Sequence, residues 1–460
     1  MEGDVGAGGD EDFGALFSGL TGAQRRAAQR RLEALSQGPA APADPLQRAR
    51  YWRVLAGLAA PEAVESLLDR AAAAVGEAVS RPPRAGGGAA GGALRPGRRV
   101  RVAAPVRIDF GGGWTDTPPF SLERGGAVVN AAVALEGELP IWAEVEVTAT
   151  PGIVLESEDI GASVGVATRA DVAGYRLPND PFALLKACLV LGGVLDPAAA
   201  APLAALPAGT GLRVRTGCRI PRGSGLGTSS ILGAAVLRAL GEVQGSAQDD
   251  AELSRQTLEL EQLMTTGGGW QDQMGAIAPG VKLVTTEPGA EQRPRVDVLP
   301  LAPQDRATLE AHLVVAYTGH HRLARNILRE VVMRYLGRDP LAMQALYQLR
   351  AVAGQLARAI AALDLERFGM LVNQAWLLNK TLDPQTSYPA VERLFSALAP
   401  HVYGAKLVGA GGGGFLVAVT RRPDGGELVA DLMARDREFA YGYVVPHRLW
   451  DDGLRVTHLG

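Results

Sequence analysis

Hydrophobic and polar positions change their spacing near residue 99. Before it, apolar residues recur at helical intervals in 23–35 and 61–79, and the remainder is rich in Ala, Gly, Arg and Pro. Such low-complexity sequence buries little apolar surface, so we expect loose structure in this region. The first predicted unit is therefore 1–98, a helical or partly disordered extension with a linker, or the remnant of a preceding domain.

From residue 99 onward the pattern predicts strands first and mostly helices later. Alternating positions predict strands at 100–110, 141–150 and 212–220, and an apolar run predicts a helix at 231–240. Later helices are expected at 252–264, 322–336, 341–362 and 365–378, with strands at 313–317, 406–408, 415–420 and 443–446. The pattern predicts an α+β protein with two further domains, 99–285 and 286–460.

Composition narrows the classes of partner. The chain has 460 residues, 47% of them apolar, which is enough for a large core divided over more than one domain. A net charge of −3 gives no broad basic surface, so we expect no nucleic-acid partner. The longest apolar tract, 187–208, is interrupted by Asp196 and three prolines, and we expect no membrane span. Two cysteines and an acidic start without an apolar core suggest a cytoplasmic protein.

A glycine-dense loop at 221–230 joins the predicted strand 212–220 to the predicted helix 231–240. Unpaired N–H groups in such a loop and at a helix N-terminus bind phosphate oxygens without a lysine. The loop lacks the Gly-Lys-Ser/Thr of a P-loop and the glycine spacing of a Rossmann fingerprint. It predicts a polyphosphate site with three hydroxyl side chains near a phosphate-bound magnesium ion. The alternative is a turn that only caps a helix.

A second block, 105–119, ends a strand in three glycines and then presents Trp114, Thr115 and Asp116. Carbohydrate sites use such groups, because a carboxylate accepts hydrogen bonds from neighbouring hydroxyls and an indole covers the apolar side of a sugar ring. The block therefore suggests a sugar site. An aspartate that caps the Thr-Pro-Pro turn is the alternative.

Two more glycine-rich blocks follow. In 258–273, three glycines precede Asp272, which lies between two glutamines whose amides would hold its carboxylate. Consecutive glycines indicate close backbone approach to another group, whereas a solvated surface aspartate is the alternative. The block 409–414 places five glycines between two strands, which suits either tight contact with a ligand or a flexible hairpin turn.

Taken in order, the four blocks resemble the GHMP kinases, which phosphorylate sugars and small metabolites with ATP. The resemblance covers about 99–460, and its three motifs are 107–116, 221–230 and 409–414. It implies an N-terminal domain like the second domain of ribosomal protein S5, here 99–285 with the ATP site, and a ferredoxin-like C-terminal domain, here 286–460. The active site would lie between them.

Within this family the fucokinase branch is the most similar. The features that carry this closer match are 112–119, 221–231, 260–273 and 317–326. The resemblance implies an ATP-dependent sugar 1-kinase that converts L-fucose into L-fucose 1-phosphate and ADP, in the salvage route to GDP-fucose. ATP and Mg2+ would be its cofactors.

The resemblance also assigns roles by position. Asp272 would face the attacking sugar hydroxyl, as a base or an orienting group, and Arg107 would lie near the transferring phosphoryl group. Asp116, Trp114 and Gly113 would bind the sugar. Magnesium would be held by Ser229 and Glu261. The residues expected to bind ATP are Pro221, Gly223, Ser224, Gly225, Leu226, Gly227, Thr228, Ser229, Ser230, Gly411, Gly412 and Gly413.

Two features depart from the relatives. Proteins of this branch often carry a GDP-fucose pyrophosphorylase module ahead of the kinase, but 1–98 is too short for one and has no nucleotidyltransferase glycine loop. We therefore expect no pyrophosphorylase activity, and we expect a homo-oligomer or an upstream pyrophosphorylase module as a partner. The pair His320-His321 has no metal-binding companions at useful spacing, which suggests variable loop surface.

Two alternative functions stay open at this point. One is a D-glycero-D-manno-heptose 7-phosphate 1-kinase, a similar branch whose members tend to lack the indoles found here at Trp114 and Trp270. The other is a catalytically silent sugar sensor on the same fold. The retained Ser229, Glu261 and Asp272 favour an enzyme.

Overall fold

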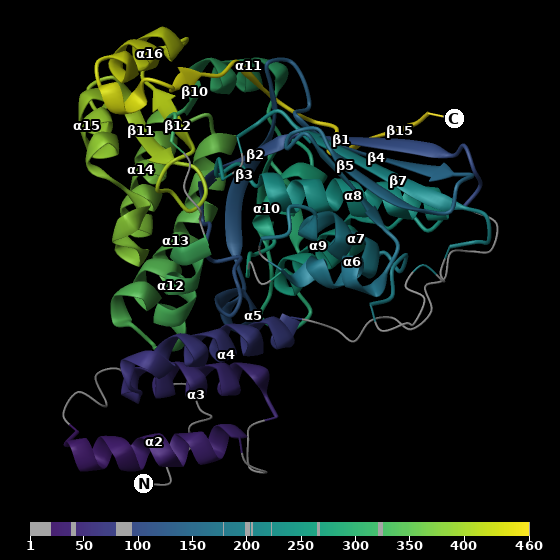
Figure 1. The fold of residues 1–460 in the computed structure, drawn as a ribbon. Coiled ribbons are helices and arrows are strands. Elements are labelled where there is room, and N and C mark those ends of the chain that lie inside the picture. The colour runs from purple at the N-terminus through teal and green to yellow at the C-terminus, as the bar shows by residue number, and fades with distance from the viewer. Residues whose placement is uncertain are drawn as a thin grey trace.

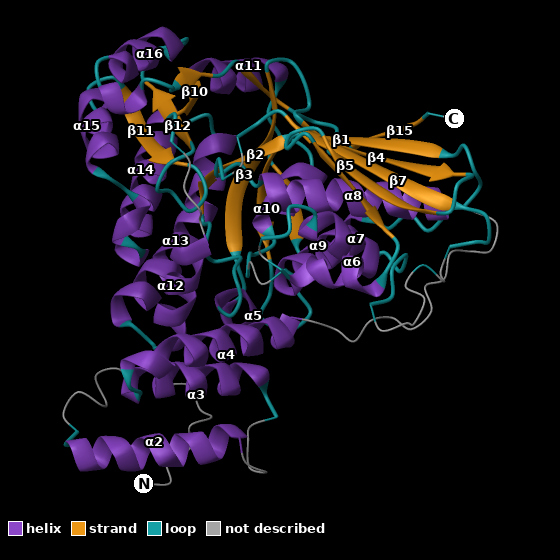
Figure 2. Ribbon diagram, viewed as in Figure 1, coloured by secondary structure: helices purple, strands orange, loops and turns teal. Residues whose placement is uncertain are grey.

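The computed structural model describes residues 20–37, 43–79, 94–177, 179–197, 203, 206–221, 223–264, 267–320 and 325–459. Figures 1 and 2 show a broad sheet with helices beneath it, a second sheet near the centre, and a third sheet surrounded by helices. Three further helices lie below these layers. Helices are combined with three mostly antiparallel sheets, which confirms the predicted α+β class.

The first sheet has six strands in the order β15-β1-β4-β7-β5-β6. Its strands are β1 (Arg99–Ala104), β4 (Ile141–Thr148), β5 (Gly152–Ser157), β6 (Ala162–Val166), β7 (Gly211–Cys218) and β15 (Arg455–His458). One face packs on helices α7 (Ala183–Leu191), α8 (Thr228–Gln244) and α9 (Asp250–Leu263), and together they bury a continuous apolar cluster. The strict alternation of β1 buries every second side chain, and Val100 and Val102 belong to that cluster.

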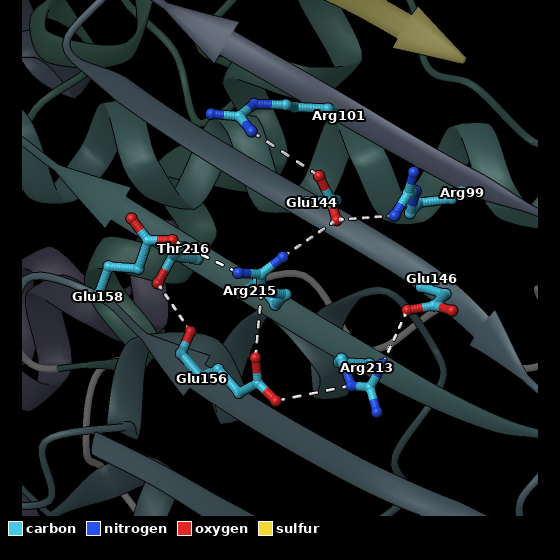
Figure 3. A network of polar contacts seen from close by, with 9 residues as sticks. All are labelled: Arg99, Arg101, Glu144, Glu146, Glu156, Glu158, Arg213, Arg215 and Thr216. Atoms are coloured by element: carbon cyan, nitrogen blue, oxygen red, sulfur yellow. Dashed lines mark hydrogen bonds and ion pairs between the residues drawn. The ribbon is translucent and has the colours of Figure 1, made fainter. Parts of the chain in front are cut away.

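The opposite face of this sheet carries charges that alternate from strand to strand (Figure 3). Glu144 on β4 lies between arginines of both neighbouring strands, 4.0 Å from Arg99, 3.9 Å from Arg101 and 3.7 Å from Arg215. Arg215 also reaches Glu156 on β5 at 3.1 Å. The Glu144 side chain is 6% exposed, but its arginine partners are 40–43% exposed and screened by solvent, so each pair contributes about 0–1 kcal/mol. Their main effect is to keep this face polar, so that only the other face can accept the helices.

The second sheet has the order β14-β3-β8-β9, and β2 pairs with the free side of β3. Its strands are β2 (Val106–Gly111), β3 (Ala127–Leu135), β8 (Val281–Thr285), β9 (Arg295–Val298) and β14 (His447–Leu449). The single strand expected at 100–110 is wrong in one respect, because Pro105 interrupts it. Proline cannot donate a ladder hydrogen bond, and the chain passes there from the first sheet to the second.

The third sheet has the order β11-β12-β10-β13. Its strands are β10 (Leu313–Tyr317), β11 (Val402–Leu407), β12 (Phe415–Thr420) and β13 (Tyr443–Val444). The helices of this region are α11 (Pro303–His312), α12 (Arg325–Leu336), α13 (Pro340–Ala361), α14 (Leu365–Leu382), α15 (Pro389–Leu398) and α16 (Gly426–Ala434). The predictions for β10 and β12 are confirmed residue for residue, and residues 322–324 of the predicted helix lie outside the described residues.

Strands that follow residue 285 also complete the sheets of the preceding region. β9 pairs with β8, β14 pairs with β3, and β15 pairs with β1. The division of the chain at residue 285 stays a prediction. Among the described residues, no helix is both long enough and apolar enough to cross a bilayer.

The helices before residue 98 are α2 (Gly22–Gln37), α3 (Pro45–Leu58) and α4 (Pro61–Val79). The loose structure expected here is wrong for α3 and α4. Trp52, Leu55 and Val75 pack with Met333 and Leu336 of α12 in one apolar cluster, because both helices have an apolar side that needs cover. Residues 1–19, 38–42 and 80–93 of the predicted extension and linker lie outside the described residues.

Short helices complete the chain and supply several residues of the site. They are α5 (Phe120–Arg124), α6 (Arg169–Ala173) and α10 (Gln271–Ile277), together with three 3-10 turns at Gly174–Arg176, Pro384–Thr386 and Arg437–Phe439. Helix α10 packs against α8, β2 and β3. It therefore lies between α8 and the second sheet. It is also next to the glycine-dense loop 221–230, which we call the phosphate loop.

Candidate active site

The arginine of the first motif lies at the centre of the candidate site. Arg107 is on β2 and only 2% exposed. Its Nε and Nη2 donate to one carboxylate oxygen of Asp272, at 2.9 and 2.6 Å, and its Nη1 donates to the carbonyl of Gly225 at 2.6 Å. One guanidinium thus joins a strand, a helix and the phosphate loop. Its planar fork suits this arrangement better than a lysine would.

Helix α10 brings Asp272 to Arg107. Asp272 is in the first turn of the helix, and its side chain is 29% exposed, so it is open to a substrate. Close packing fixes the helix, because a Cβ at Gly275 would lie 2.3 Å from Cβ of Arg107. A Cβ at Gly227 would likewise lie 3.0 Å from Cβ of Asp272. Glycines on both sides therefore allow the carboxylate, the guanidinium and the loop to meet.

Asp116 is a second carboxylate of the site and is almost completely buried. The backbone N–H of Gln271 donates to its Oδ2 at 3.1 Å, whereas its Oδ1 has no partner among the described residues. Burial raises the pKa of Asp116 to about 7, and the nearby carboxylates of Asp272 and Asp109 add to this increase. A buried acceptor oxygen without a partner is the expected form of a site that awaits a hydroxyl donor.

The turn that carries Asp116 is shaped by its neighbours. A side chain at Gly113 would crowd its neighbours, because a Cβ there would lie 3.0 Å from Nε2 of Gln271 and 3.1 Å from Oδ2 of Asp109. Trp114 has a positive φ of 77° and is 7% exposed, packed in the main apolar cluster. Its role as a stacking surface for a sugar stays a prediction, as do the assigned roles of Gly113 and Asp116.

The sequence predicts that the side-chain amide of Gln271 holds the carboxylate of Asp272, whereas in the structure Arg107 donates to that carboxylate. A place for Gln271 beside Asp116 was not predicted. Its Oε1 is buried without a partner among the described residues, and a Cβ at Gly113 would lie 3.4 Å from this atom and 3.1 Å from Oδ2 of Asp109. The Nε1 atom of Trp270 is also buried without a partner among the described residues. Unsatisfied polar atoms are rare in protein interiors, so a group of them marks a place for water or ligand. The three glycines before Trp270 were the available signal.

The phosphate loop has the expected backbone. Gly223, Gly225 and Gly227 have φ values of 70°, 81° and 78°, which side chains rarely adopt. Gly227 is the N-cap of α8 and no side chain caps the helix, so its first-turn N–H groups are open to an anion. Leu226 is fully buried and anchors the loop. Arg222 lies outside the described residues, and the roles of 221–230 in binding ATP stay predictions.

The C-terminal glycine loop lies directly against the phosphate loop. The backbone N–H of Phe415 donates to the carbonyl of Ser224 at 2.9 Å, and a Cβ at Gly414 would lie 2.2 Å from that oxygen. A Cβ at Gly225 would lie 2.4 Å from the carbonyl of Val408. The glycines at Gly411, Gly412 and Gly413 all have positive φ. The C-terminal glycine loop 409–414 therefore packs closely on the phosphate loop. Its contact with ATP stays a prediction.

The predicted magnesium ligands lie at the start of α8 and near the end of α9. Glu261 is 7% exposed and accepts a hydrogen bond of 2.6 Å from Oγ of Ser230, while Ser229 is exposed in the first turn of α8. Hydroxyl and carboxylate oxygens are the ligands that Mg2+ prefers, and ATP would supply further oxygens. The roles of Ser229 and Glu261 as magnesium ligands stay predictions. Among the described residues, no three His, Cys, Asp or Glu side chains gather as a metal site.

His320 packs against the C-terminal glycine loop with its side chain 39% exposed, and its assignment to variable loop surface stays a prediction. Its ring lies edge-on to Tyr388 and Phe439, at centroid distances of 5.6 and 6.3 Å, and its carbonyl accepts from the N–H of Gly414 at 2.7 Å. It therefore supports the C-terminal glycine loop. His321 lies outside the described residues.

A cavity of about 160 Å³ lies beside Pro221, at the start of the phosphate loop. It is lined by Glu136, Arg219, Pro221, Phe415 and Tyr443, among others. Neither Asp116 nor Asp272 lines it. It is thus distinct from the pair of carboxylates described above.

Models of the GHMP kinases N terminal domain and the GHMP kinases C terminal domain match residues 175–280 and 356–436. The bifunctional fucokinase/GDP-fucose pyrophosphorylase of Arabidopsis thaliana is 40% identical over 342 residues, covering 74% of this chain and 32% of that protein. The L-fucokinase/L-fucose-1-P guanylyltransferase of Bacteroides fragilis is 40% identical over 363 residues, covering 77% and 38%. The chain spans about a third of the length of these curated relatives.

Other similarities are more distant. The D-glycero-alpha-D-manno-heptose 7-phosphate kinase of Campylobacter jejuni is 24% identical over 323 residues, covering 69% of this chain and 88% of that protein. A solved D-glycero-D-manno-heptose 1-phosphate kinase from Bacteroides thetaiotaomicron has a TM-score of 0.58 at 22% identity, covering 78% of this chain and 99% of its own. Lactococcus lactis galactokinase complexed with galactose has a TM-score of 0.58 at 18% identity, covering 78% and 95%. These solved structures share the fold, and with both domain models matched the chain belongs to the GHMP kinases.

Proposed function

We propose that this chain is an ATP-dependent sugar kinase that phosphorylates the anomeric hydroxyl of L-fucose, giving L-fucose 1-phosphate and ADP. The observation that carries the proposal is the 40% identity, over about three quarters of the chain, to two proteins named as fucokinases. Identity to the heptose 7-phosphate kinase is 24%. Because the chain spans about a third of the fucokinase relatives, the proposal concerns their kinase activity alone.

The geometry supports phosphoryl transfer with Asp272 as the group that receives the proton. The anomeric oxygen forms a bond to the γ-phosphorus of ATP, the bond from that phosphorus to the β,γ-bridging oxygen breaks, and ADP leaves. Asp272 is exposed enough to reach the sugar hydroxyl and accepts its proton or orients it. Arg107 already holds this carboxylate, so it fixes the position of the acceptor while its charge lies beside the phosphate loop.

Sugar binding is proposed at Asp116. Its unpaired Oδ1 and the nearby unpaired Oε1 of Gln271 are buried acceptors that two hydroxyls of a sugar would satisfy. Hydroxyls that donate to buried acceptors give strong discrimination, because an analogue without them leaves these oxygens unpaired. Ser229 and Glu261 would hold Mg2+, which supplies charge neutralisation at the phosphates.

A cytoplasmic location is part of the proposal. ATP as phosphoryl donor and a chain with only two cysteines in 460 residues support it. A homo-oligomer stays a prediction. An upstream pyrophosphorylase module also stays a prediction, and the names of the two similar proteins, which give two activities each, favour it.

The test is ADP release from ATP and Mg2+ with L-fucose, L-galactose, D-arabinose, D-galactose and heptose 7-phosphate as acceptors. We expect the highest kcat/KM with L-fucose and a fall in kcat of about 10²- to 10⁴-fold in Asp272→Asn, with little change in KM. Activity on heptose 7-phosphate alone would move the chain to the heptose kinases. Sugar binding without turnover on any acceptor would identify a sensor.

A further inference from the structure

Two fully buried opposite charges connect the second and third sheets. Nζ of Lys406, on β11, lies 2.6 Å from Oδ2 of Asp109, on β2, and the two side chains are 1% and 2% exposed. The partners are 297 positions apart in the chain. Asp109 follows Arg107 by two positions on the same strand. The pair is therefore a direct charged contact between the first motif and the strand that leads into the third.

Asp109 lies under the turn that carries Asp116. Its Oδ2 is 3.1 Å from the position that a Cβ would occupy at Gly113, so the carboxylate limits where this turn can lie. Its negative charge also contributes to the raised pKa of Asp116. The carboxylates whose charges act on Asp116 include Asp109 from β2 and Asp272 from α10. Arg107 is connected to this group through Asp272, and Lys406 through Asp109. Lys406 thus adds the one positive charge that comes from β11.

Lys406 lies just before the C-terminal glycine loop. The backbone N–H of Val408, two residues later, donates to the carbonyl of Phe415 at 2.8 Å and closes the loop. The carbonyl of Val408 meets Gly225 of the phosphate loop so closely that a Cβ there would lie 2.4 Å away. A lysine fixed at Asp109 therefore sets where the glycine loop meets the phosphate loop.

Stability alone does not account for this pair. Burying two charges costs several kcal/mol of desolvation, and apolar residues of similar volume are often at least as stable. Here the compensation is incomplete, because Oδ1 of Asp109 has no partner among the described residues. What the pair does provide is a fixed distance between the motifs 107–116 and 409–414. It also places a neutralised carboxylate beside the turn 113–116, which we call the sugar turn.

We propose that Lys406 and Asp109 are positioning residues that fix the sugar turn and the C-terminal glycine loop relative to each other. Lys406 also balances the charge of Asp109 beside the turn that carries Asp116. The inference rests on the proposed function of this site as a sugar kinase.

The test compares Lys406→Met, Asp109→Asn and the double variant with wild type, after circular dichroism has shown each to be folded. Lys380→Met is the matched control, because Lys380 pairs with Glu392 at 2.9 Å on the surface. The measurements are the pH profile of kcat/KM for the sugar and the affinity for Mg-ATP by calorimetry.

We expect opposite shifts of the acidic limb of the profile. Lys406→Met leaves Asp109 uncompensated and moves the limb to higher pH, whereas Asp109→Asn removes a negative charge and moves it to lower pH, each by at least about 0.5 pH units. The double variant returns towards wild type. Lys406→Met also lowers kcat/KM and the affinity for Mg-ATP by about 10- to 100-fold each, because both loops lose their fixed contact. Lys380→Met changes neither.

Shifts in the same direction, or unchanged profiles in folded variants, would overturn the inference. If Lys406→Met does not fold, Asp109→Asn carries the test by the direction of its shift. If wild type does not use L-fucose, the proposed substrate is wrong. The pH profile is then measured with whichever acceptor of the panel is active. If no acceptor is active, an unchanged affinity for Mg-ATP in both single variants would overturn the inference.

Discussion

Replacing Asp116 by Asn should make the protein more stable and less active, and the gain should depend on pH. The carboxyl is buried with one oxygen unpaired, and burial raises its pKa from 3.8 to about 7. In the unfolded chain the same group ionises near 3.8. Between these values the folded state binds more protons than the unfolded state, so this group lowers stability as pH rises from 3.8 to 7.

The magnitude follows from the two pKa values. A difference of this size corresponds to about 4 kcal/mol of cost once both states are ionised above pH 7, and to between about 1 and 2 kcal/mol at pH 5. Asn is similar in volume and cannot ionise, so Asp116→Asn removes this cost. The gain in stability should therefore be larger at pH 8 than at pH 5 by about 2 to 3 kcal/mol. Activity should fall because the variant replaces an acceptor oxygen proposed to bind the sugar.

Urea unfolding at pH 5 and pH 8 measures this difference, with unchanged m-values as the criterion for comparison. The control is Asp431→Asn, since Asp431 is exposed on α16 and should change neither curve by more than about 0.5 kcal/mol. Other titrating groups cancel when variant and wild type are compared at each pH. A gain that is the same at both pH values, or a loss of stability at pH 8, would refute the reasoning.

Three more variants test the supports of the site. Gly275→Ala should lower kcat about 10²-fold, because its Cβ would lie 2.3 Å from Cβ of Arg107 and would displace α10; kcat unchanged by steady-state assay would show that the helix tolerates the shift. Burial lowers the pKa of Lys282 to about 7, so its charged form lowers the stability of the folded protein most below pH 7. In urea unfolding, the free energy of unfolding of Lys282→Met relative to wild type should therefore be higher at pH 6 than at pH 9 by about 2 to 3 kcal/mol. Equal differences at both pH values would contradict this. Glu261→Gln should raise the Mg2+ concentration for half-maximal rate about tenfold or more, and an unchanged magnesium titration would remove Glu261 from the metal site.

Much of the framework followed from the sequence because it depends on local pattern. Strands β10 and β12 have short apolar runs with clear ends, and α4 has a regular helical period that ends before a low-complexity linker. The glycine spacing of the phosphate loop likewise needs only local backbone geometry. These features can be predicted from local sequence, because each forms with few contacts to distant residues.

The contacts that complete the site could not be found in this way. In the sequence Lys406 is one polar residue at the start of a short predicted strand, and only the packing of the third sheet beside the second places it on Asp109. Gln271 and His320 gain their roles from neighbours far along the chain, Gly113 and Gly414 respectively. The break of the first strand at Pro105 had a local signal, since proline ends a ladder, but the exchange between sheets depends on tertiary packing.

The pairing of β15 with β1 has a consequence for how the protein is made. The strand Arg455–His458 forms the edge of a sheet that begins at Arg99, and β14 likewise covers a side of β3. During synthesis the ribosome releases β1 and β3 long before these partners exist, so both edges must wait through several hundred residues of translation. Until then they are open to pairing with other chains. Expression of residues 99–285 alone would therefore yield an incomplete and aggregation-prone fragment, and the catalytic unit must be produced as one piece.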